Sequence, residues 1–122
     1  MIKGTGIDIC STERIRRAAA DEAFRRRVFT PEELAHADAK ANGAESLAAA
    51  YAAKEAFAKA TGLGLAKIGL KNVSLTHDEG GRPQLAIADV GALGITPRAK
   101  FHVSISHDAG IAAAVVIYEE VD

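Results

Sequence analysis

The chain has 122 residues with a formal net charge of −1, 48% hydrophobic and 25% charged residues, and a single cysteine. This length favours one domain over residues 1–122 with a sizeable core, and the charge balance argues against the basic footprint of a nucleic-acid-binding protein. No segment reaches the ~20 apolar residues of a membrane span, and the lone cysteine and the short N-terminal apolar run predict a cytoplasmic protein.

The N-terminal half begins with a strand and continues in helices. The segment IKGTGIDI alternates with period two, which predicts a strand whose glycines share one face with Asp8. Residues 12–29 are arginine-rich and follow a helical pattern, so we expect one helix there. A second helix should begin at Thr30, which can form a capping box with Glu33, and end near residues 42–43.

The remaining segments complete an α+β pattern. The longest helix is expected over residues 44–60, followed by the glycine-punctuated loop TGLGLAKIG. Alternating segments then predict two pairs of strands, at residues 73–77 with 84–88 around the turn DEGGRP, and at 101–106 with 111–118 around residues 107–110. This order is typical of an α+β domain with a mainly antiparallel sheet, against which the one long helix would pack.

Three charged residues interrupt the apolar long helix. On a helical wheel Tyr51 lies on the core-facing arc and Lys54 falls inside it, whereas Glu55 and Lys59 lie together on a neighbouring edge. The ordinary interpretation is an i,i+4 ion pair between Glu55 and Lys59, with Lys54 reaching out to solvent. The functional alternative is that the alanines beside Glu55 let a ligand approach, and that a phosphate lies against the backbone at Gly62 and Gly64.

Asp8 is the second carboxylate of interest. Aspartate is disfavoured in strands, so Asp8 is expected either to face water at a strand end, to cap the next helix, or to have a function. In the functional interpretation it lies over a flat surface lined by Gly4 and Gly6, with room for a ligand. Asp8 and Glu55 would then offer two oxygen ligands to Mg²⁺, while water and substrate phosphates complete its shell.

The blocks GIDIC, YAAKEAFAKATGLG and HVSISHDAGIAAAVVI occur together in this order, with the turn GRP before the last of them. With these blocks the chain resembles the bacterial holo-acyl-carrier-protein synthases, the small class of 4'-phosphopantetheinyl transferases, over nearly its whole length. The G-x-D element alone is a weak signal, AAKEAFAKA is quite specific, and the combination is strongly so. The resemblance implies the 4'-phosphopantetheinyl transferase fold.

The resemblance also implies an activity. Enzymes of this family transfer the phosphopantetheine arm of coenzyme A to a serine of an apo carrier protein and release adenosine 3',5'-bisphosphate. They require Mg²⁺ and work as homotrimers with active sites between subunits. The implied partners are coenzyme A and an acidic acyl carrier protein, with fatty acid and lipid biosynthesis the expected setting, although a polyketide or another pathway stays open. No nucleic acid and no membrane is implied.

Individual residues take roles from the same resemblance. Asp8 and Glu55 match the metal ligands, and Lys59 matches a lysine near the pyrophosphate. His107 matches a histidine that contacts the coenzyme phosphates and reaches a neighbouring subunit's site. The expected catalytic residues are Glu55, Lys59 and His107, and the expected coenzyme-binding residues are Lys59, Gly62, Gly64, Arg82, Pro83 and His107. Glu55, directly or through a metal-bound water, is one candidate general base, while Lys54 could orient Glu55, pair with a phosphate or be structural.

The chain departs from the family pattern at Ala50, where many relatives have arginine before the aromatic residue. If that arginine binds a coenzyme phosphate, another basic residue should compensate. Lys40, Lys67 and Arg82 are the candidates, and the sequence does not choose among them. Of the other histidines, His36 is expected to face solvent.

Six arginines crowd residues 14–27, an excess of positive charge that is local because the whole chain is near neutral. A solvated helix face is the ordinary interpretation. The alternative is a docking surface for an acidic carrier, formed by Arg14, Arg17, Phe24 and Arg27. Two further functions compete with the transferase: a docking module without chemistry, and a metal-dependent phosphohydrolase that uses the same carboxylates.

Overall fold

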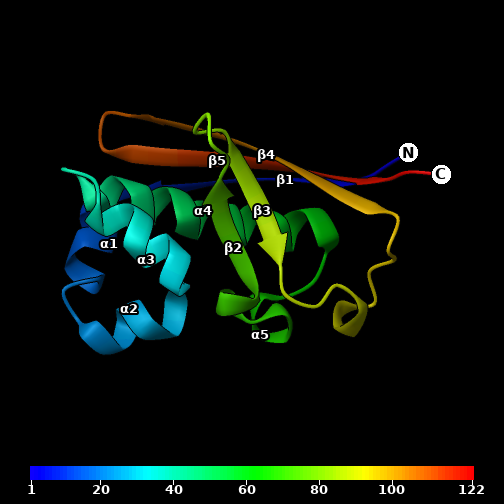
Figure 1. Ribbon diagram of the computed structural model, residues 1–122, viewed down its shortest axis with the longest axis horizontal. Helices are drawn as coiled ribbons and strands as arrows, with labels where there is room; N and C mark the ends of the chain where they lie inside the picture. Colours follow the sequence, from blue (N-terminus) through cyan, green and yellow to red (C-terminus); the bar gives the residue numbers. More distant parts are fainter.

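A long helix packed on a three-stranded antiparallel sheet dominates the computed structural model, which describes residues 1–122 (Figure 1). The sheet has the order β1 (Ile2–Ser11), β5 (Ile111–Glu120), β4 (Ala99–Asp108), and α4 (Gly43–Thr61) lies across one face, mainly against β1 and β5. The predicted α+β class, with a mainly antiparallel sheet and one long helix, is confirmed.

The other elements surround α4. A separate two-stranded ladder, β2 (Val73–His77) with β3 (Pro83–Ile87), contacts α4 and the edge strand β4. The short helices are α1 (Thr12–Ala18), α2 (Glu22–Val28), α3 (Pro31–Asp38) and α5 (Leu65–Ile68), with single 3₁₀ turns at Leu70–Asn72 and Gly91–Leu93. In Figure 1, α1 to α3 gather at one end of the molecule, and the two chain termini lie together at the other. No helix has both the length and the apolar character that crossing a bilayer requires.

Three local expectations were wrong. The single helix predicted over residues 12–29 is two helices, because the Asp21 side chain accepts a hydrogen bond from the backbone N–H of Ala23 (2.9 Å) and starts α2 anew. The loop expected after α4 contains α5. The last hairpin turns over Ala109 and Gly110 alone, both with positive φ (51° and 79°), so His107 belongs to β4 and pairs with Ala112.

The glycine-lined face of β1 has no room for a ligand, contrary to expectation, because α4 covers it. A Cβ added at Gly4 would lie 2.0 Å from the carbonyl oxygen of Ala60, and one at Gly6 would lie 2.0 Å from that of Ala56. Glycine is therefore required at both positions by close backbone contact. The small alanine side chains of α4 also allow other elements to pack closely on the helix, since Ala52, Ala53 and Ala56 are fully buried.

Lys54 is buried and does not reach solvent. Its side chain is 0% exposed, and its ammonium lies 2.7 Å from the carboxylate of Glu33, whose side chain is 1% exposed. The ammonium also donates to the backbone carbonyl oxygens of Leu70 (2.8 Å) and Val73. Burial lowers the pKa of Lys54, and the charge and hydrogen bond of Glu33 act against that shift.

Glu33 connects this ion pair to α3 and to β2. It closes the predicted capping box of α3: its carboxylate accepts from the N–H of Thr30 (2.9 Å), and the Thr30 hydroxyl accepts from the N–H of Glu33 (3.2 Å). Its second oxygen accepts from the N–H of Leu75 in β2 (2.8 Å). Of the roles open to Lys54, the structural one is therefore the role that its contacts support.

We expect Lys54→Met to lower the free energy of unfolding by about 3–5 kcal/mol, because it leaves the Glu33 charge buried without its partner. The double variant Lys54→Met, Glu33→Gln should recover part of this loss. Lys71→Met, at an exposed position, should change stability by no more than about 0.5 kcal/mol and serves as control. Urea unfolding curves test the expectation, and a Lys54→Met midpoint equal to that of the wild-type protein would contradict it.

Candidate functional site

The two carboxylates singled out in the sequence meet at the edge of the sheet. Asp8 follows the close-packed glycines on the inner face of β1, and its side chain is 15% exposed. The Glu55 carboxyl on α4 has a raised pKa, caused first by its burial and then by a hydrogen bond and charge repulsion from Asp8. The two side chains are therefore in direct contact, and they share a position that favours binding a cation.

Lys59 completes this cluster but pairs differently from expectation. Its ammonium donates to the Asp8 carboxylate (3.1 Å) and to the backbone carbonyl oxygen of Ile7 (2.9 Å). The ordinary i,i+4 ion pair with Glu55 is not formed. Because the side chain is 57% exposed, the ammonium remains accessible to an anion in front of the two carboxylates.

Tyr51 is a member of the cluster that sequence reasoning placed only in the core. It lies one helical turn before Glu55 and is half-buried. Burial first, and then the neighbouring Glu55 carboxyl, raise the pKa of Tyr51, whereas Arg14 acts in the opposite direction. The i,i+4 spacing of Tyr51 and Glu55 was the available signal.

The donor set fits a hard cation bound partly by solvent or substrate. No group of three or more His, Cys, Asp or Glu residues is arranged to hold a metal, which is unlike the four-ligand site of structural zinc. Mg²⁺ is commonly held by one or two carboxylates together with water and substrate phosphates. A divalent cation would also offset the repulsion between Asp8 and Glu55 that contributes to the raised pKa of Glu55.

The glycines after α4 leave the surface beside Lys59 open. Gly62 ends the helix in a left-handed conformation (φ 73°), which explains its residue type. Gly64 has an ordinary φ of −75°, so its conformation does not require glycine. A Cβ at either position would meet no atom within 4 Å, so both glycines border open space.

His107 lies apart from the carboxylate cluster. Its ring lies 3.4 Å from the carboxylate of Glu45, at the start of α4, and it lines a cavity of about 520 Å³ beside β4. Glu45 precedes Glu55 by ten residues, or about 15 Å of helix, and β1 and β4 are opposite edges of the sheet. Pro83 lines the same cavity, whereas Arg82 does not. Within one chain, the predicted site residues therefore lie in two separate places, one around Asp8 and Glu55 and the other around His107.

The position of Ala50 also bears on this cavity. Ala50 is buried, with 2% of its surface exposed, and shares a helix face with Ser46, which lines the cavity. Among the three basic residues considered as substitutes for arginine at this position, Lys40 lines the cavity, while Lys67 and Arg82 do not.

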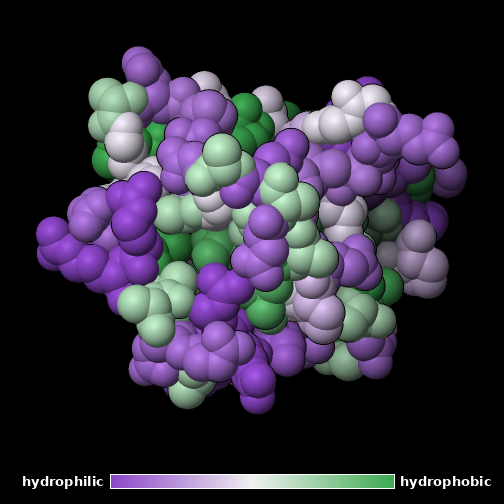
Figure 2. Space-filling view, turned by 60° about the vertical axis from the view of Figure 1, so that its left-hand side comes forward, coloured by the Kyte–Doolittle hydropathy of each residue, from purple (hydrophilic) through white to green (hydrophobic).

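The arginine-rich segment forms an exposed surface on α1 and α2. Arg14, Arg17 and Arg27 are exposed, and the Arg27 guanidinium lies over the half-buried Phe24 ring at 5.9 Å. Figure 2, turned to bring the side of α1 to α3 forward, shows a mostly hydrophilic face with hydrophobic residues in its hollows. Because Arg14 influences the pKa of Tyr51, this surface adjoins the carboxylate cluster.

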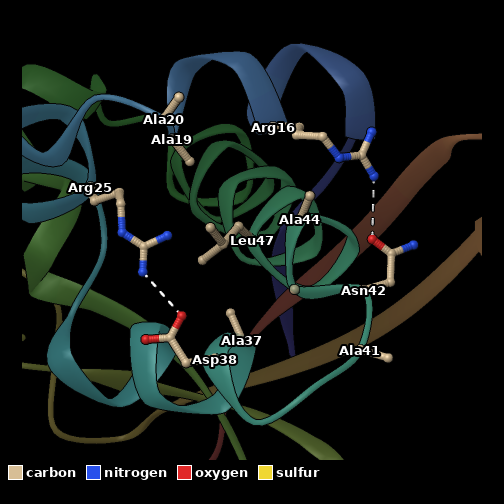
Figure 3. A pocket seen from close by; sticks show the side chains of 11 residues that line it. Arg16, Ala19, Ala20, Arg25, Ala37, Asp38, Ala41, Asn42, Ala44 and Leu47 are labelled. Atoms are coloured by element: carbon tan, nitrogen blue, oxygen red, sulfur yellow. Dashed lines mark hydrogen bonds and ion pairs between the residues drawn. The ribbon is translucent and has the colours of Figure 1, made fainter.

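Two other arginines are engaged within the chain. Arg25 pairs with Asp38 (3.1 Å) and Arg16 donates to Asn42 (3.4 Å), each from the rim of a cavity of about 320 Å³ (Figure 3). Figure 3 shows Leu47 between them, at the centre of the view. These contacts connect α1 and α2 to the segment around α3. Among the six arginines of residues 14–27, only Arg14 and Arg27 form no ion pair.

Comparisons with known proteins agree with this geometry. The profile of the 4'-phosphopantetheinyl transferase superfamily matches residues 4–116. The chain is 42% identical to a holo-[acyl-carrier-protein] synthase of Treponema denticola over 122 residues, covering 98% of this chain and 99% of the relative. It is 43% identical to a synthase of the same name from Streptomyces coelicolor over 126 residues, with 97% and 98% covered.

Solved structures show the same similarity in three dimensions. The holo-[acyl-carrier-protein] synthase of Neisseria meningitidis superimposes with a TM-score of 0.85 at 34% identity, covering 98% of this chain and all of that one. A synthase from Bacillus anthracis in complex with coenzyme A (3',5'-ADP) gives 0.82 at 31% identity, with 99% of each covered. The fold and site therefore define an enzyme of the phosphopantetheinyl transferase class. Within that class, the chain belongs to the holo-[acyl-carrier-protein] synthase family.

Proposed function

We propose that this chain, as a single domain over residues 1–122 in the cytoplasm, transfers the 4'-phosphopantetheine group of coenzyme A to a serine of an apo acyl carrier protein in a Mg²⁺-dependent reaction. Adenosine 3',5'-bisphosphate is the second product. The observation that carries the proposal is the contact of Asp8 with Glu55 beside the accessible ammonium of Lys59, in a chain of this family.

The chemistry of phosphoryl transfer matches what these residues can do. Such reactions need positioning and neutralisation of charge more than covalent help from the protein. Asp8 and Glu55 would hold Mg²⁺, which supplies charge neutralisation at the pyrophosphate. Lys59 would stabilise the negative charge that develops on the leaving phosphate, and open backbone at Gly62 and Gly64 would let the pyrophosphate approach.

The serine must lose its proton as its oxygen attacks phosphorus and the bond to the leaving bisphosphate breaks. Glu55 is a candidate to accept that proton, directly or through a metal-bound water. Tyr51, one helical turn before Glu55, would help to orient the Glu55 carboxyl. His107, Pro83 and Arg82 would contact coenzyme A away from the reacting phosphate.

A homotrimer with active sites between subunits would join the two groups of residues. The outer face of β1 exposes Ile7 (64%) and Ile9 (65%), an apolar surface that association would bury. His107 on one copy would then complete the site around Asp8 and Glu55 on another. Sedimentation equilibrium tests this arrangement: a wild-type monomer at the concentration used for assays would contradict it.

The acidic carrier would dock on Arg14, Arg17, Phe24 and Arg27. The supporting observations are the exposure of the three arginines and the position of Arg14 beside the carboxylate cluster. Opposite charge would steer the carrier toward this surface and set its orientation. Phe24 would supply a small apolar anchor.

Intact-mass spectrometry of an apo carrier incubated with this protein and coenzyme A tests the transfer. We expect a mass gain equal to phosphopantetheine with Mg²⁺ and none with a chelator. Asp8→Ala and Glu55→Ala should each abolish the gain, at a cost of at least about 10³-fold in rate, while Lys71→Met should keep it. Hydrolysis of coenzyme A without any carrier would instead favour a phosphohydrolase.

The docking surface is tested by the double charge reversal Arg14→Glu, Arg17→Glu. We expect the KM for the carrier to rise by about 10-fold or more at low salt, because attraction becomes repulsion. The dissociation constant of coenzyme A should stay unchanged. Reversal of the same total charge at Lys71 and Arg98 provides the control, and an unaltered KM in the Arg14, Arg17 variant would overturn this docking surface.

A further inference from the structure

One face of the three-stranded sheet is uncovered in the single chain. The helix α4 packs on the face that carries Gly4 and Gly6, and in Figure 1 the helices lie on that side of the sheet. Alternate side chains of each strand point to the opposite side, which we call the outer face. On β1 they include the exposed Ile7 and Ile9, and Ile7 lies opposite Val115 of β5. The outer face therefore presents apolar side chains that association between copies would bury.

The same face carries an ionisable pair. His102 of β4 lies opposite Ile117, and Glu119 of β5 lies opposite Lys100. Because residues directly opposite each other in a ladder point to the same side, all four side chains belong to the outer face. The imidazole Nε2 of His102 lies 2.9 Å from the carboxylate of Glu119, and the two side chains are 53% and 31% exposed. The pair is thus wet in the single chain but stands beside apolar positions.

The other charges around the pair are positive. Lys100 lies on β4, and Lys3 follows Ile2, which pairs with Glu119 across from β1. The hydrogen bond of His102 is the first cause that lowers the pKa of Glu119, burial acts in the opposite direction, and the charges of His102, the N-terminal ammonium and Lys100 lower it further. Glu119 is therefore ionised at neutral pH. The member of the pair whose charge changes in this range is His102.

Burial of this pair favours its protonated form. A carboxylate that is buried beside a neutral imidazole is an uncompensated charge, whereas the same carboxylate beside an imidazolium forms a pair with no net charge. Lys3 and Lys100 are exposed, and their long side chains can keep the ammonium groups in water. They therefore compensate a buried Glu119 less than a proton on the adjacent His102 does.

We propose that association of copies of this chain through the outer face buries the pair of His102 and Glu119 and takes up a proton at His102, so that the assembly weakens as pH rises through neutrality. The inference rests on the proposed homotrimer. A second copy is the occupant of this face because Asp8 and His107 lie on the two edge strands, β1 and β4, which a head-to-tail contact in a closed ring brings together. Since such a site is complete only in the assembly, the proton also controls activity.

The pH dependence has a defined direction and a limit. Each copy takes up at most one proton at His102, so the association constant of three copies falls by at most about 10³-fold per pH unit. At low pH the separated chain already carries this proton, so uptake ceases and the assembly is at its most stable. As pH rises, the proton must be taken from a solution that holds fewer of them, and association becomes weaker.

Sedimentation velocity over a dilution series of the wild-type protein, at about pH 6 and about pH 8 and constant ionic strength, tests this linkage. We expect the protein concentration at which half of the chains are assembled to rise at least about fivefold from the lower to the higher pH. The rate of carrier modification per enzyme, measured at nanomolar and at micromolar enzyme, gives a second readout. Its ratio between the two concentrations should fall at the higher pH, because pH effects on the chemical step cancel in that ratio.

Substitutions assign the effect to the pair. His102→Gln keeps a hydrogen-bond donor for the carboxylate but cannot gain a charge, so its assembly should not depend on pH. Glu119→Gln should reverse the dependence, because a buried imidazolium then lacks its partner and low pH opposes association. His36→Gln removes a histidine of α3, away from the outer face, and as the matched control it should keep the wild-type dependence. Wild-type assembly that is unchanged or strengthened as pH rises, or a His102→Gln variant that retains the wild-type dependence, would overturn the inference.

The intact-mass assay keeps this inference separate from the proposed function. If the wild-type protein modifies the carrier and is equally assembled at both pH values, the transfer stands and the proton linkage is wrong. If it modifies the carrier as a monomer, the homotrimer and the linkage are both wrong. If it modifies no carrier under any condition, the proposed function is wrong, and the dilution series still decides the linkage.

Discussion

The backbone of β1 lies directly on the backbone of α4, and the rest of the site depends on this contact. Gly4 and Gly6 allow it from the strand, because any side chain there would collide with helix carbonyl groups. The same contact fixes how far Asp8 stands from the helix, two residues beyond Gly6 on the same face. Asp8 therefore meets Glu55 and Lys59 on the two sides of Ala56, without the chain having to place either side chain on a mobile loop.

Each side of α4 has a separate task. The alanines on one side pack against β1. On another side, Lys54 forms an ion pair with Glu33 inside the core, and on the third, Glu55 borders the open surface. The ion pair under the helix ties α3 and β2 to α4 through the hydrogen bonds of Glu33. Charged groups buried in this way give limited net stability but are costly to separate, so they specify one arrangement of the three elements.

Local patterns in the sequence predicted the elements well, and contacts between distant elements poorly. The capping box at Thr30 and the order of strands and helices follow from near neighbours in the chain, and both are observed. The surface over the glycines was mistaken for ligand space because alternation does not reveal which element covers a strand. His36 stacks on His77, but the two residues belong to different elements, α3 and β2, so no periodic pattern in the sequence could have predicted their contact. The pairing of Asp8 with Glu55 was expected from the preference of Mg²⁺ for carboxylate ligands and from the family resemblance, because their separation in the sequence does not by itself indicate a contact.

Lys54 and Glu55 are adjacent in sequence yet lie in opposite environments, one sealed in the interior and the other at the reaction surface. Adding or removing one residue upstream in α4 would turn the helix by about 100° relative to its surroundings. A deletion would carry the Glu55 carboxylate toward Glu33, giving like charges inside, whereas an insertion would carry the Lys54 ammonium to the place of Glu55, giving a cation where the metal would bind. Insertions and deletions in this helix are therefore penalised twice, in folding and in chemistry, so length variation among functional descendants of this chain should be confined to its loops.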